Sequence, residues 1–226
     1  MKQFNNIYCI FEQSGTFKKA FKKLNMGKNV FDIDIVKTNN VDLQIDLFKE
    51  LLYINERKTI FDTITHNDLI IAFFPCTYFE IQNDLLFNGT HYGIRNKSDY
   101  QKIEIIQARE TQRHFYYNYF CTLYKYALDK KIPTIIENPY STQSYLYKYF
   151  PIKPTIIDYD RTKLNDNMKK PTMYYFINIE PKANFELINA NNQQISCITH
   201  LTPNKIDRSL ITNDYATNFI KIFIKE

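Results

Sequence analysis

Two segments of the chain end an apolar run with a side chain that can do chemistry. In DLIIAFFPCTYFE (68–80), the apolar run stops at Pro75 and Cys76 follows at once. In PTIIENP (133–139), a second apolar run ends in Glu137 and Asn138. A thiol whose pKa is lowered acts as a nucleophile, and a nearby carboxyl group can donate or accept a proton. Cys76 and Glu137 are therefore the first candidates for a catalytic pair.

Both residues also have an ordinary structural interpretation. A single cysteine is most often a small buried hydrophobe that serves packing, and a glutamate at a strand end is often a surface carboxylate. The position favours chemistry, because the end of a strand in an α/β sheet opens to a crevice and not to the core. The residue types alone leave packing and nucleophilic attack both open for Cys76.

A third segment, FEQSGTF (11–17), has the pattern of a ligand-binding turn. Gly15 lies between an expected strand and an expected helix, where a glycine lets the backbone approach a ligand and the helix N-terminus favours polar or anionic groups. Asp32 and Asp34 end the next strand, where an acid often holds ribose hydroxyl groups. The alternatives are an ordinary turn at Gly15, a solvated strand end, and an exposed helix acid for Asp46.

The hydrophobic pattern predicts how these segments are positioned. Alternation of short apolar strands with amphipathic helices is typical of an α/β fold, with a mostly parallel twisted sheet and helices on both faces. Ligands in such sheets bind at the carboxyl ends of the strands, where Cys76 and Glu137 fall. We expect strands at 6–11, 29–36, 68–74, 133–139, 155–162 and 172–180, helices at 16–25, 42–54, 102–130 and 214–226, a loop at 81–98, and a short helix to Phe150 capped by Ser141 or Thr142.

Composition limits the class of protein. The 226 residues are 44% hydrophobic, with no repeat and no Gly/Ser-rich linker, which indicates a single packed domain over 1–226. A net charge of +5 permits binding to a polyanion without requiring it. No apolar run approaches the roughly 18 residues of a membrane helix, and the first residues are too polar for a secretory signal, so we expect no membrane association. Four cysteines stand far apart in the chain and predict a reducing cytosol rather than disulfides: Cys9, Cys76, Cys121 and Cys197. The four histidines, at 66, 91, 114 and 200, show no metal-ligand spacing, so no metal is expected.

The order of the segments resembles the DNA cytosine-5 methyltransferases and their small phage-encoded relatives. FEQSGTF, DID, DLIIAFFPCT, IIENP and then DRT with KKPT follow one another as in that family, over about residues 7–180. The segment 208–224 is similar to the family's C-terminal helix, which closes the cofactor pocket. The resemblance implies a Rossmann-like methyltransferase fold, S-adenosylmethionine (SAM) as cofactor, DNA as partner, and the cytoplasm of a bacterial or phage-infected cell.

The resemblance also implies roles for single residues. A thiolate adds to cytosine carbon 6, an acid acts at ring nitrogen 3, and the methyl group passes to carbon 5 of a base that has left the duplex. The implied catalytic residues are Cys76, Glu137, Asn138 and Arg161. The implied cofactor-binding residues are Phe11, Gln13, Ser14, Gly15, Thr16, Phe17, Asp34, Asp46 and Pro75.

The sequence departs from the family pattern in three places. Gln13 stands where the first glycine of the cofactor turn is expected, and Phe74 replaces the first proline before the cysteine. Only residues 181–207 occupy the place of the family's separate target-recognition domain. Three interpretations of the substrate therefore stay open: DNA read weakly, DNA read through a protein partner, or RNA. A catalytically inactive protein of the same fold, which binds nucleic acid or a host partner, is the alternative function.

Overall fold

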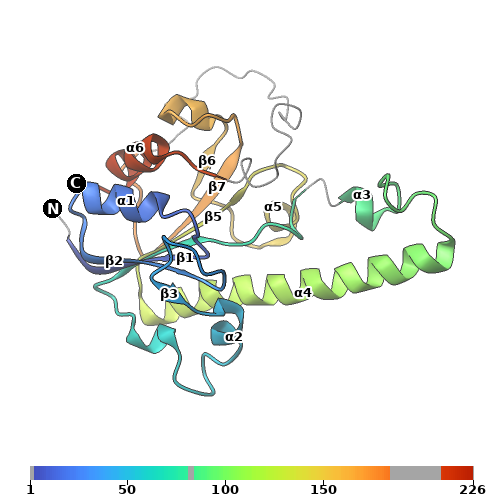
Figure 1. The fold of residues 1–226 in the computed structure, drawn as a ribbon, viewed down its shortest axis with the longest axis horizontal. Coiled ribbons are helices and arrows are strands. Elements are labelled where there is room, and N and C mark those ends of the chain that lie inside the picture. Colours follow the sequence, from blue (N-terminus) through green and yellow to red (C-terminus); the bar gives the residue numbers. More distant parts are fainter. Residues whose placement is uncertain (1–2, 81–83, 184–209, 226) are drawn as a thin grey trace.

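The computed structural model describes residues 3–80, 84–183 and 210–225. One seven-stranded sheet runs through it in the order β3-β2-β1-β4-β5-β7-β6 (Figure 1). The pairs β1 with β2, β1 with β4, β2 with β3 and β4 with β5 are parallel, which confirms the expected mostly parallel sheet. The strands are β1 (Phe4–Ile10), β2 (Gly27–Asp34), β3 (Leu43–Gln44), β4 (Leu69–Phe73), β5 (Thr134–Pro139), β6 (Ile156–Asp158) and β7 (Thr172–Ile177).

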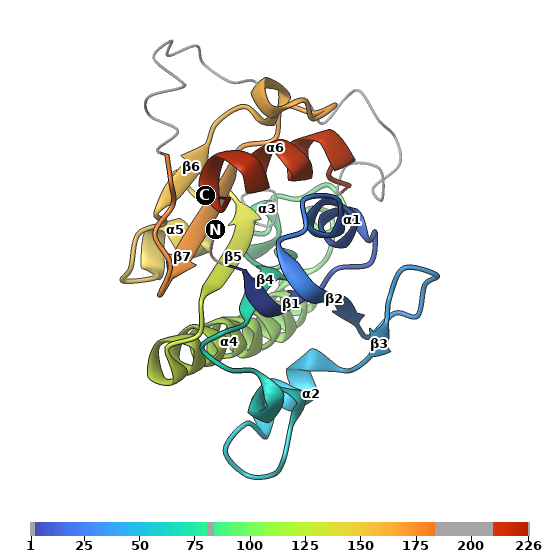
Figure 2. The same cartoon turned by 90° about the vertical axis from the view of Figure 1, so that its left-hand side faces the viewer.

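Helices cover both faces of the sheet, as Figure 2 shows in end view. α1 (Thr16–Lys23) and α6 (Asn213–Phe223) pack on one face, and the helix expected at 214–226 is thus confirmed as α6. α2 (Leu47–Leu52), α4 (Asp99–Lys130) and α5 (Tyr145–Tyr149) contribute to the core on the other face. Alternate residues of one strand serve the two cores: in β4, Leu69 and Ile71 face the first, and Ile70 and Ala72 face the second. This two-sided burial explains why the run is apolar throughout.

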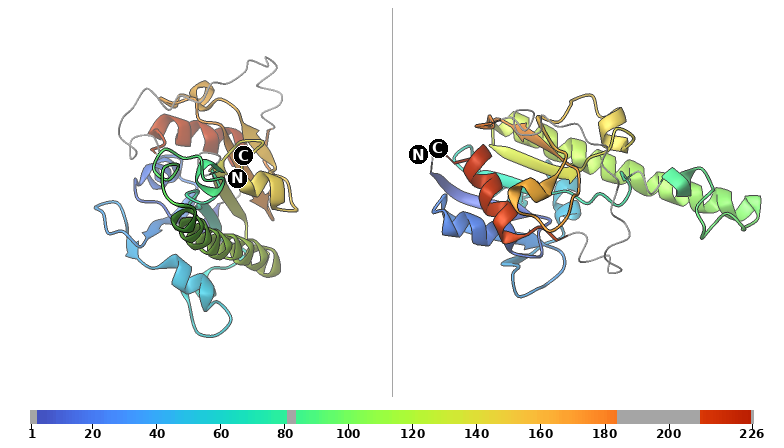
Figure 3. Two further views of the ribbon diagram at one scale, coloured as in Figure 1. Left: turned by 90° about the vertical axis from the view of Figure 1, so that its right-hand side faces the viewer. Right: turned by 90° about the horizontal axis from the view of Figure 1, so that it is seen from above.

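The long helix α4 has two different halves. A capping box between Ser98 and Gln101 starts it, and Lys131 ends it in the left-handed region at φ 54°. Its C-terminal half lies in the core, whereas its N-terminal half extends well beyond the sheet (Figures 1 and 3). The short helix α3 (Asp84–Phe87) lies beside this outer half, and the Arg113 guanidinium sits 3.8 Å from the centroid of the Phe87 ring.

The register brings the candidate site together. Phe73 of β4 pairs with Glu137 of β5, and Ile10 of β1 pairs with Ala72 of β4 and Ile33 of β2. Because these strands are parallel, their carboxyl ends meet at one edge of the sheet. The strand order also reverses beside β1, which is flanked by β2 and β4, and such a reversal opens a crevice for ligands.

Four local expectations were wrong. Residues 42–54 form β3 and then α2, because Leu43 pairs with β2 and Asp46 caps a helix that begins only at Leu47. The segment 155–162 leaves the sheet after Asp158, and the Asp160 side chain then accepts a hydrogen bond from the Thr162 amide and starts the 3-10 helix η3 (Arg161–Leu164).

The other two concern α3 and α5. α3 interrupts the expected loop at 81–98, and α5 has Ser144 as its N-cap in place of Ser141 or Thr142.

The sheet is not parallel throughout, since β7 runs antiparallel to both β5 and β6. The chain between β6 and β7 holds only a short 3-10 helix and returns on the same edge, whereas a parallel crossover usually needs a longer helix.

Two further expectations concern other parts of the chain. Residues 184–209, which include most of the short segment in place of a recognition domain and the start of the 208–224 motif, lie outside the described residues. Within the described residues, no helix combines the length and apolarity that crossing a membrane requires.

Candidate active site

A cavity of about 240 Å³ opens at the carboxyl edge of β1, β4 and β5. Its walls come from the turn after β1, the turn after β4, the end of β5, η3, the segment before β7 and the segment before α6. The lining residues are Phe11, Glu12, Gln13, Ser14, Phe73, Phe74, Pro75, Cys76, Glu137, Pro139, Arg161, Lys170, Leu210 and Ile211. Cys76 and Glu137, the candidate catalytic pair, therefore share one cavity.

Cys76 is a half-buried thiol three residues beyond the end of β4. Its Sγ donates a hydrogen bond to Oε1 of Glu80 at 2.7 Å. Burial raises the pKa of the Cys76 thiol far above its ordinary value, and the Glu80 carboxylate adds to the rise, while Lys170 opposes it. At neutral pH the sulfur therefore carries its proton, and an attack by this thiol requires a base.

Glu137 is a buried carboxyl group, with 8% of its surface exposed. Burial raises its pKa, and the cations Lys170 and Arg161 hold it down in part. A carboxyl group with a raised pKa keeps a larger protonated fraction near neutral pH, which suits a proton donor.

Asn138 has a different position from its neighbour. Because residues of a strand alternate between faces, its side chain points away from the Glu137 side chain, and it is not among the cavity residues. The Asn138 Nδ2 donates to the backbone oxygen of Phe74 at 2.8 Å. The amide thus fixes the end of β4 just before Pro75 and Cys76, and its role in the site is to position the thiol.

Arg161 lines the cavity from η3, with 1% of its surface exposed. Its guanidinium forms an ion pair with Asp166, donates to the Leu210 backbone oxygen at 3.2 Å, and lies 5.1 Å from the centroid of the Tyr215 ring. These contacts hold a fixed positive charge at the cavity wall and join η3 to the segment before α6.

A hydrogen-bonded chain of buried side chains lies next to Arg161. The Tyr215 hydroxyl donates to Oδ2 of Asp158 at 2.8 Å, and the Tyr174 and Tyr215 hydroxyls are 2.8 Å apart. Burial raises the pKa of Asp158 to about 6, against the pull of the Tyr215 hydrogen bond. This network belongs to β6, β7 and α6, and it fixes the wall that carries Arg161.

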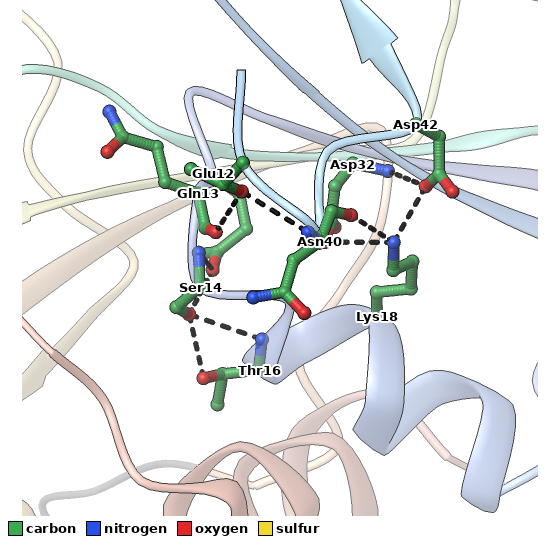
Figure 4. A network of polar contacts seen from close by, with 9 residues as sticks. Glu12, Gln13, Ser14, Thr16, Lys18, Asp32, Asn40 and Asp42 are labelled. Atoms are coloured by element: carbon green, nitrogen blue, oxygen red, sulfur yellow. Dashed lines mark hydrogen bonds and ion pairs between the residues drawn. The ribbon is translucent and has the colours of Figure 1, made fainter. Parts of the chain in front are cut away.

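The turn after β1 is rigid and carries an unexpected acid. Phe11 adopts the left-handed region at φ 58°, which is rare for an aromatic residue. The buried carboxylate of Glu12 accepts hydrogen bonds from the amide and the hydroxyl of Ser14, and the Ser14 hydroxyl reaches Oγ1 of Thr16 at 2.7 Å (Figure 4). Burial raises the pKa of Glu12, so the cavity contains a second carboxyl group with a raised pKa.

Gly15 has a structural place at the start of α1. It caps α1 in the left-handed region at φ 72°, and a Cβ there would lie 2.9 Å from Cβ of Asn40. Gly15 is not among the lining residues, and neither are Thr16 or Phe17. Phe17 is fully buried between the sheet and α6, with ring centroids 4.8 Å from Phe73.

The two acids expected near a cofactor lie in different places. Asp34 ends β2 in a buried position, where its Oδ1 accepts from the Val36 amide at 2.7 Å and from Nε2 of Gln13 at 3.3 Å. Gln13 thereby joins Asp34 to the cavity wall. Asp46 is exposed, is not among the lining residues, and accepts from the Lys49 amide at 3.1 Å as the N-cap of α2.

Behind the turn lies a charge cluster of the buried Lys18 and Asp32 with the exposed Asp42 (Figure 4). The Lys18 ammonium is 3.4 Å from Oδ2 of Asp32 and 2.9 Å from Oδ2 of Asp42. Asp32 is completely buried, and burial raises its pKa to about 7 although Lys18 lowers it. These ion pairs connect α1 to β2 and so stabilise the turn between β1 and α1.

Three functional candidates were missed by the sequence argument. Glu12 and Lys170 line the cavity, and Glu80 holds the thiol. Glu12 lies two residues after the strand that ends at Ile10, and Glu80 lies four residues after Cys76, so both had a local signal in the sequence. Lys170 belongs to the KKPT segment of the motif order, but residue type did not single it out, since a lysine pair also fits a solvated surface. In the described part of the chain, no group of three or more His, Cys, Asp or Glu side chains is arranged to hold a metal ion.

The fold and the cavity define an open α/β protein with a mixed, mostly parallel seven-stranded sheet and a crevice of apolar and charged residues at the carboxyl ends of its strands. Neither a protein-family model nor a curated protein sequence matches the chain.

Proposed function

We propose that the protein is a SAM-dependent methyltransferase that acts on carbon 5 of cytosine in DNA through a covalent adduct with Cys76. The observation that carries the proposal is the shared cavity, in which the thiol after β4 and the buried carboxyl group of β5 meet the turn after β1. Thiol, acid and cofactor turn are the three parts that such a reaction needs, and the sequence motifs for all three occur in the order of that family.

The chain offers suitable groups for the cofactor. Asp34 would hold the ribose hydroxyl groups, and Glu12 would face the cationic end of the methionine part, because a buried carboxylate is a natural partner for an ammonium or sulfonium charge. Phe11 adds an apolar surface beside them, packed on Phe48 at 5.2 Å between centroids. When bound, SAM supplies the electrophilic methyl group.

The remaining wall would receive the base. Cytosine carbon 5 is a weak nucleophile, and addition of the Cys76 sulfur to carbon 6 makes it an enamine-like one. Glu137 would donate a proton toward ring nitrogen 3, and its raised pKa supports that role. Arg161 and Lys170 supply positive charge at the same wall for the polar edge of the base or its phosphate. The base must leave the duplex to reach these groups.

Recognition of the DNA target needs an explanation of its own. The segment 181–207 is too short for a separate recognition domain, so we propose that the DNA sequence is read weakly or through a partner protein. A net charge of +5 supports attraction to the phosphate backbone, which is independent of sequence.

The decisive experiment compares wild type with Cys76→Ala, and with Cys121→Ala as a matched control on α4 outside the cavity. We expect Cys76→Ala to bind SAM in calorimetry but to transfer no methyl group, and Cys121→Ala to behave as wild type. Wild type should also form a denaturant-resistant adduct with DNA that carries 5-fluorocytosine, because fluorine at carbon 5 blocks the final elimination. Methyl transfer by Cys76→Ala would exclude the covalent mechanism.

A second candidate function is a protein of the same fold that no longer methylates and binds nucleic acid or a host partner. The observation that favours it is the hydrogen bond from Gln13 to Asp34, which occupies the carboxylate proposed for the ribose. Gln13→Gly tests it: SAM binding that appears only in this variant supports the non-catalytic function. Assays on RNA in parallel with DNA separate a third case, in which transfer occurs on RNA alone.

A further inference from the structure

The turn after β4 folds a carboxylate back onto the thiol. The amides of Phe79 and Glu80 both point to the backbone oxygen of Cys76, at 2.8 and 3.2 Å, and close one tight turn. This turn returns the Glu80 side chain to Cys76, where Sγ donates to Oε1 at 2.7 Å. Glu80 is not among the cavity residues, so its carboxylate reaches the sulfur from behind while the thiol itself faces the cavity.

The charges around the sulfur leave it protonated. Glu80 from the same turn and Glu137 from β5 both disfavour a thiolate, and Lys170 from the segment before β7 is the one cation among the named influences on this thiol. Burial adds to the two carboxylates. A protonated thiol is a poor nucleophile, so the proton must leave as the sulfur attacks.

We propose that Glu80 is the base that takes the proton from Cys76 as the sulfur attacks a carbon atom in the cavity. The identity of that carbon, ring carbon 6 of cytosine, rests on the proposed function, whereas the proton transfer does not. The structure supplies the required geometry directly, since the acceptor oxygen already lies within hydrogen-bond distance of the sulfur.

The step is balanced by groups of this chain. The Sγ–H bond breaks and its proton passes to Oε1 of Glu80, while the sulfur electron pair forms the bond to carbon 6. The electrons of the carbon 5–carbon 6 double bond form a double bond between carbon 4 and carbon 5, the electrons of the carbon 4–nitrogen 3 double bond move to ring nitrogen 3, and nitrogen 3 takes a proton from Glu137. The addition reverses by the same path: the sulfur leaves with its electron pair and recovers its proton from Glu80, and Glu137 recovers the proton from nitrogen 3.

The first test is alkylation of Cys76 by iodoacetamide between pH 6 and 9, followed by mass spectrometry of the Cys76 peptide. It needs neither SAM nor nucleic acid. In wild type, the Glu80 carboxylate stays beside the thiol over this range, so the rate should change less than about threefold across it. In Glu80→Gln, attack needs free thiolate, and the rate should rise about tenfold per pH unit.

The controls separate proton transfer from loss of structure. Glu80→Asp keeps the carboxylate and should keep part of the flat profile, and Glu104→Gln removes an exposed carboxylate of α4 and should match wild type. Thermal unfolding of each variant shows whether it folds. A wild-type rate that rises tenfold per pH unit, as in Glu80→Gln, would overturn the proposal.

The second test is adduct formation with DNA carrying 5-fluorocytosine. Glu80→Gln should slow it by a factor of about 10²–10⁴. Equal adduct rates in both proteins would overturn the proposal for this reaction. A flat wild-type alkylation profile without any adduct on DNA or RNA would support the proton transfer and refute the cytosine chemistry, so the two failures are distinguishable.

Discussion

Substitution of Gly15 by alanine tests whether this glycine serves the fold or a ligand. Two costs arise from the structure: alanine in the left-handed region loses about 1–2 kcal/mol, and a Cβ only 2.9 Å from Cβ of Asn40 adds about 1–3 kcal/mol of overpacking. Reduced freedom of the unfolded chain returns about 0.4–1 kcal/mol. We therefore expect Gly15→Ala to lower the free energy of unfolding by about 1–4.6 kcal/mol.

Gly89 offers a matched control for the backbone term. It has a similar φ of 78°, but the nearest atom to a Cβ there is Cδ of Lys102 at 3.9 Å, the end of a flexible side chain. Gly89→Ala should cost only about 0–1.6 kcal/mol. The difference between the two variants isolates the contact with Asn40.

Urea denaturation, followed by circular dichroism, measures both variants. The double variant Gly15→Ala with Asn40→Gly removes the opposing Cβ and should recover at least about 1 kcal/mol of the contact term. Equal losses for Gly15→Ala and Gly89→Ala, or no recovery in the double variant, would refute the close approach of the turn to Asn40. A stable Gly15→Ala protein that has lost SAM binding would instead show that Gly15 contacts the ligand.

Three further predictions address the residues around the cavity. Asn138→Ala leaves the buried Phe74 carbonyl without its hydrogen-bond donor, so it should lower the free energy of unfolding, measured in urea, by about 1–3 kcal/mol. It should also alter the alkylation rate of Cys76, and unchanged values of both would contradict the positioning role of Asn138. The pKa of Asp32 is raised from 3.8 to about 7 in the folded protein, so the folded protein binds a proton that the unfolded chain releases, and the free energy of unfolding should fall as pH rises from 4 to 7. Asp32→Asn should reduce the difference in stability between pH 5 and pH 8, measured by urea titration. An unchanged difference would contradict the burial of this acid. Glu137→Gln should slow adduct formation by a factor of about 10²–10⁴ while SAM binding persists, and a rate equal to wild type would remove Glu137 from the chemistry.

The local sequence determined the strands that carry the two reactive groups. β4 is apolar at every position, and β5 carries the apolar pair Ile135 and Ile136 before Glu137, because both faces of each strand are buried. Since parallel strands gather their carboxyl ends at one edge, this pattern was sufficient to predict Cys76 and Glu137 as neighbours. The Gly15 turn, α4 and α6 followed from equally local signals of spacing and composition.

Local patterns failed where pairing over long distances decided the structure. The pair Leu43–Gln44 became a strand because β2 offered a free edge, and β7 reversed direction because the chain after β6 returned on the same side of the sheet. Asp46 was expected to bind the cofactor, but in the structure its side chain caps the N-terminus of α2.

The chemistry of the cavity was likewise decided by the tertiary structure. The burial of a carboxyl group and its pKa depend on segments that are far apart in the chain. Glu137 lies near Lys170 and Arg161 only after β5, β7 and η3 have assembled. The sequence by itself determined which residues could react, because residue type and strand periodicity are local properties. Only the packing of distant segments decided which charges surround them, because desolvation and charge pairing act through space rather than along the chain.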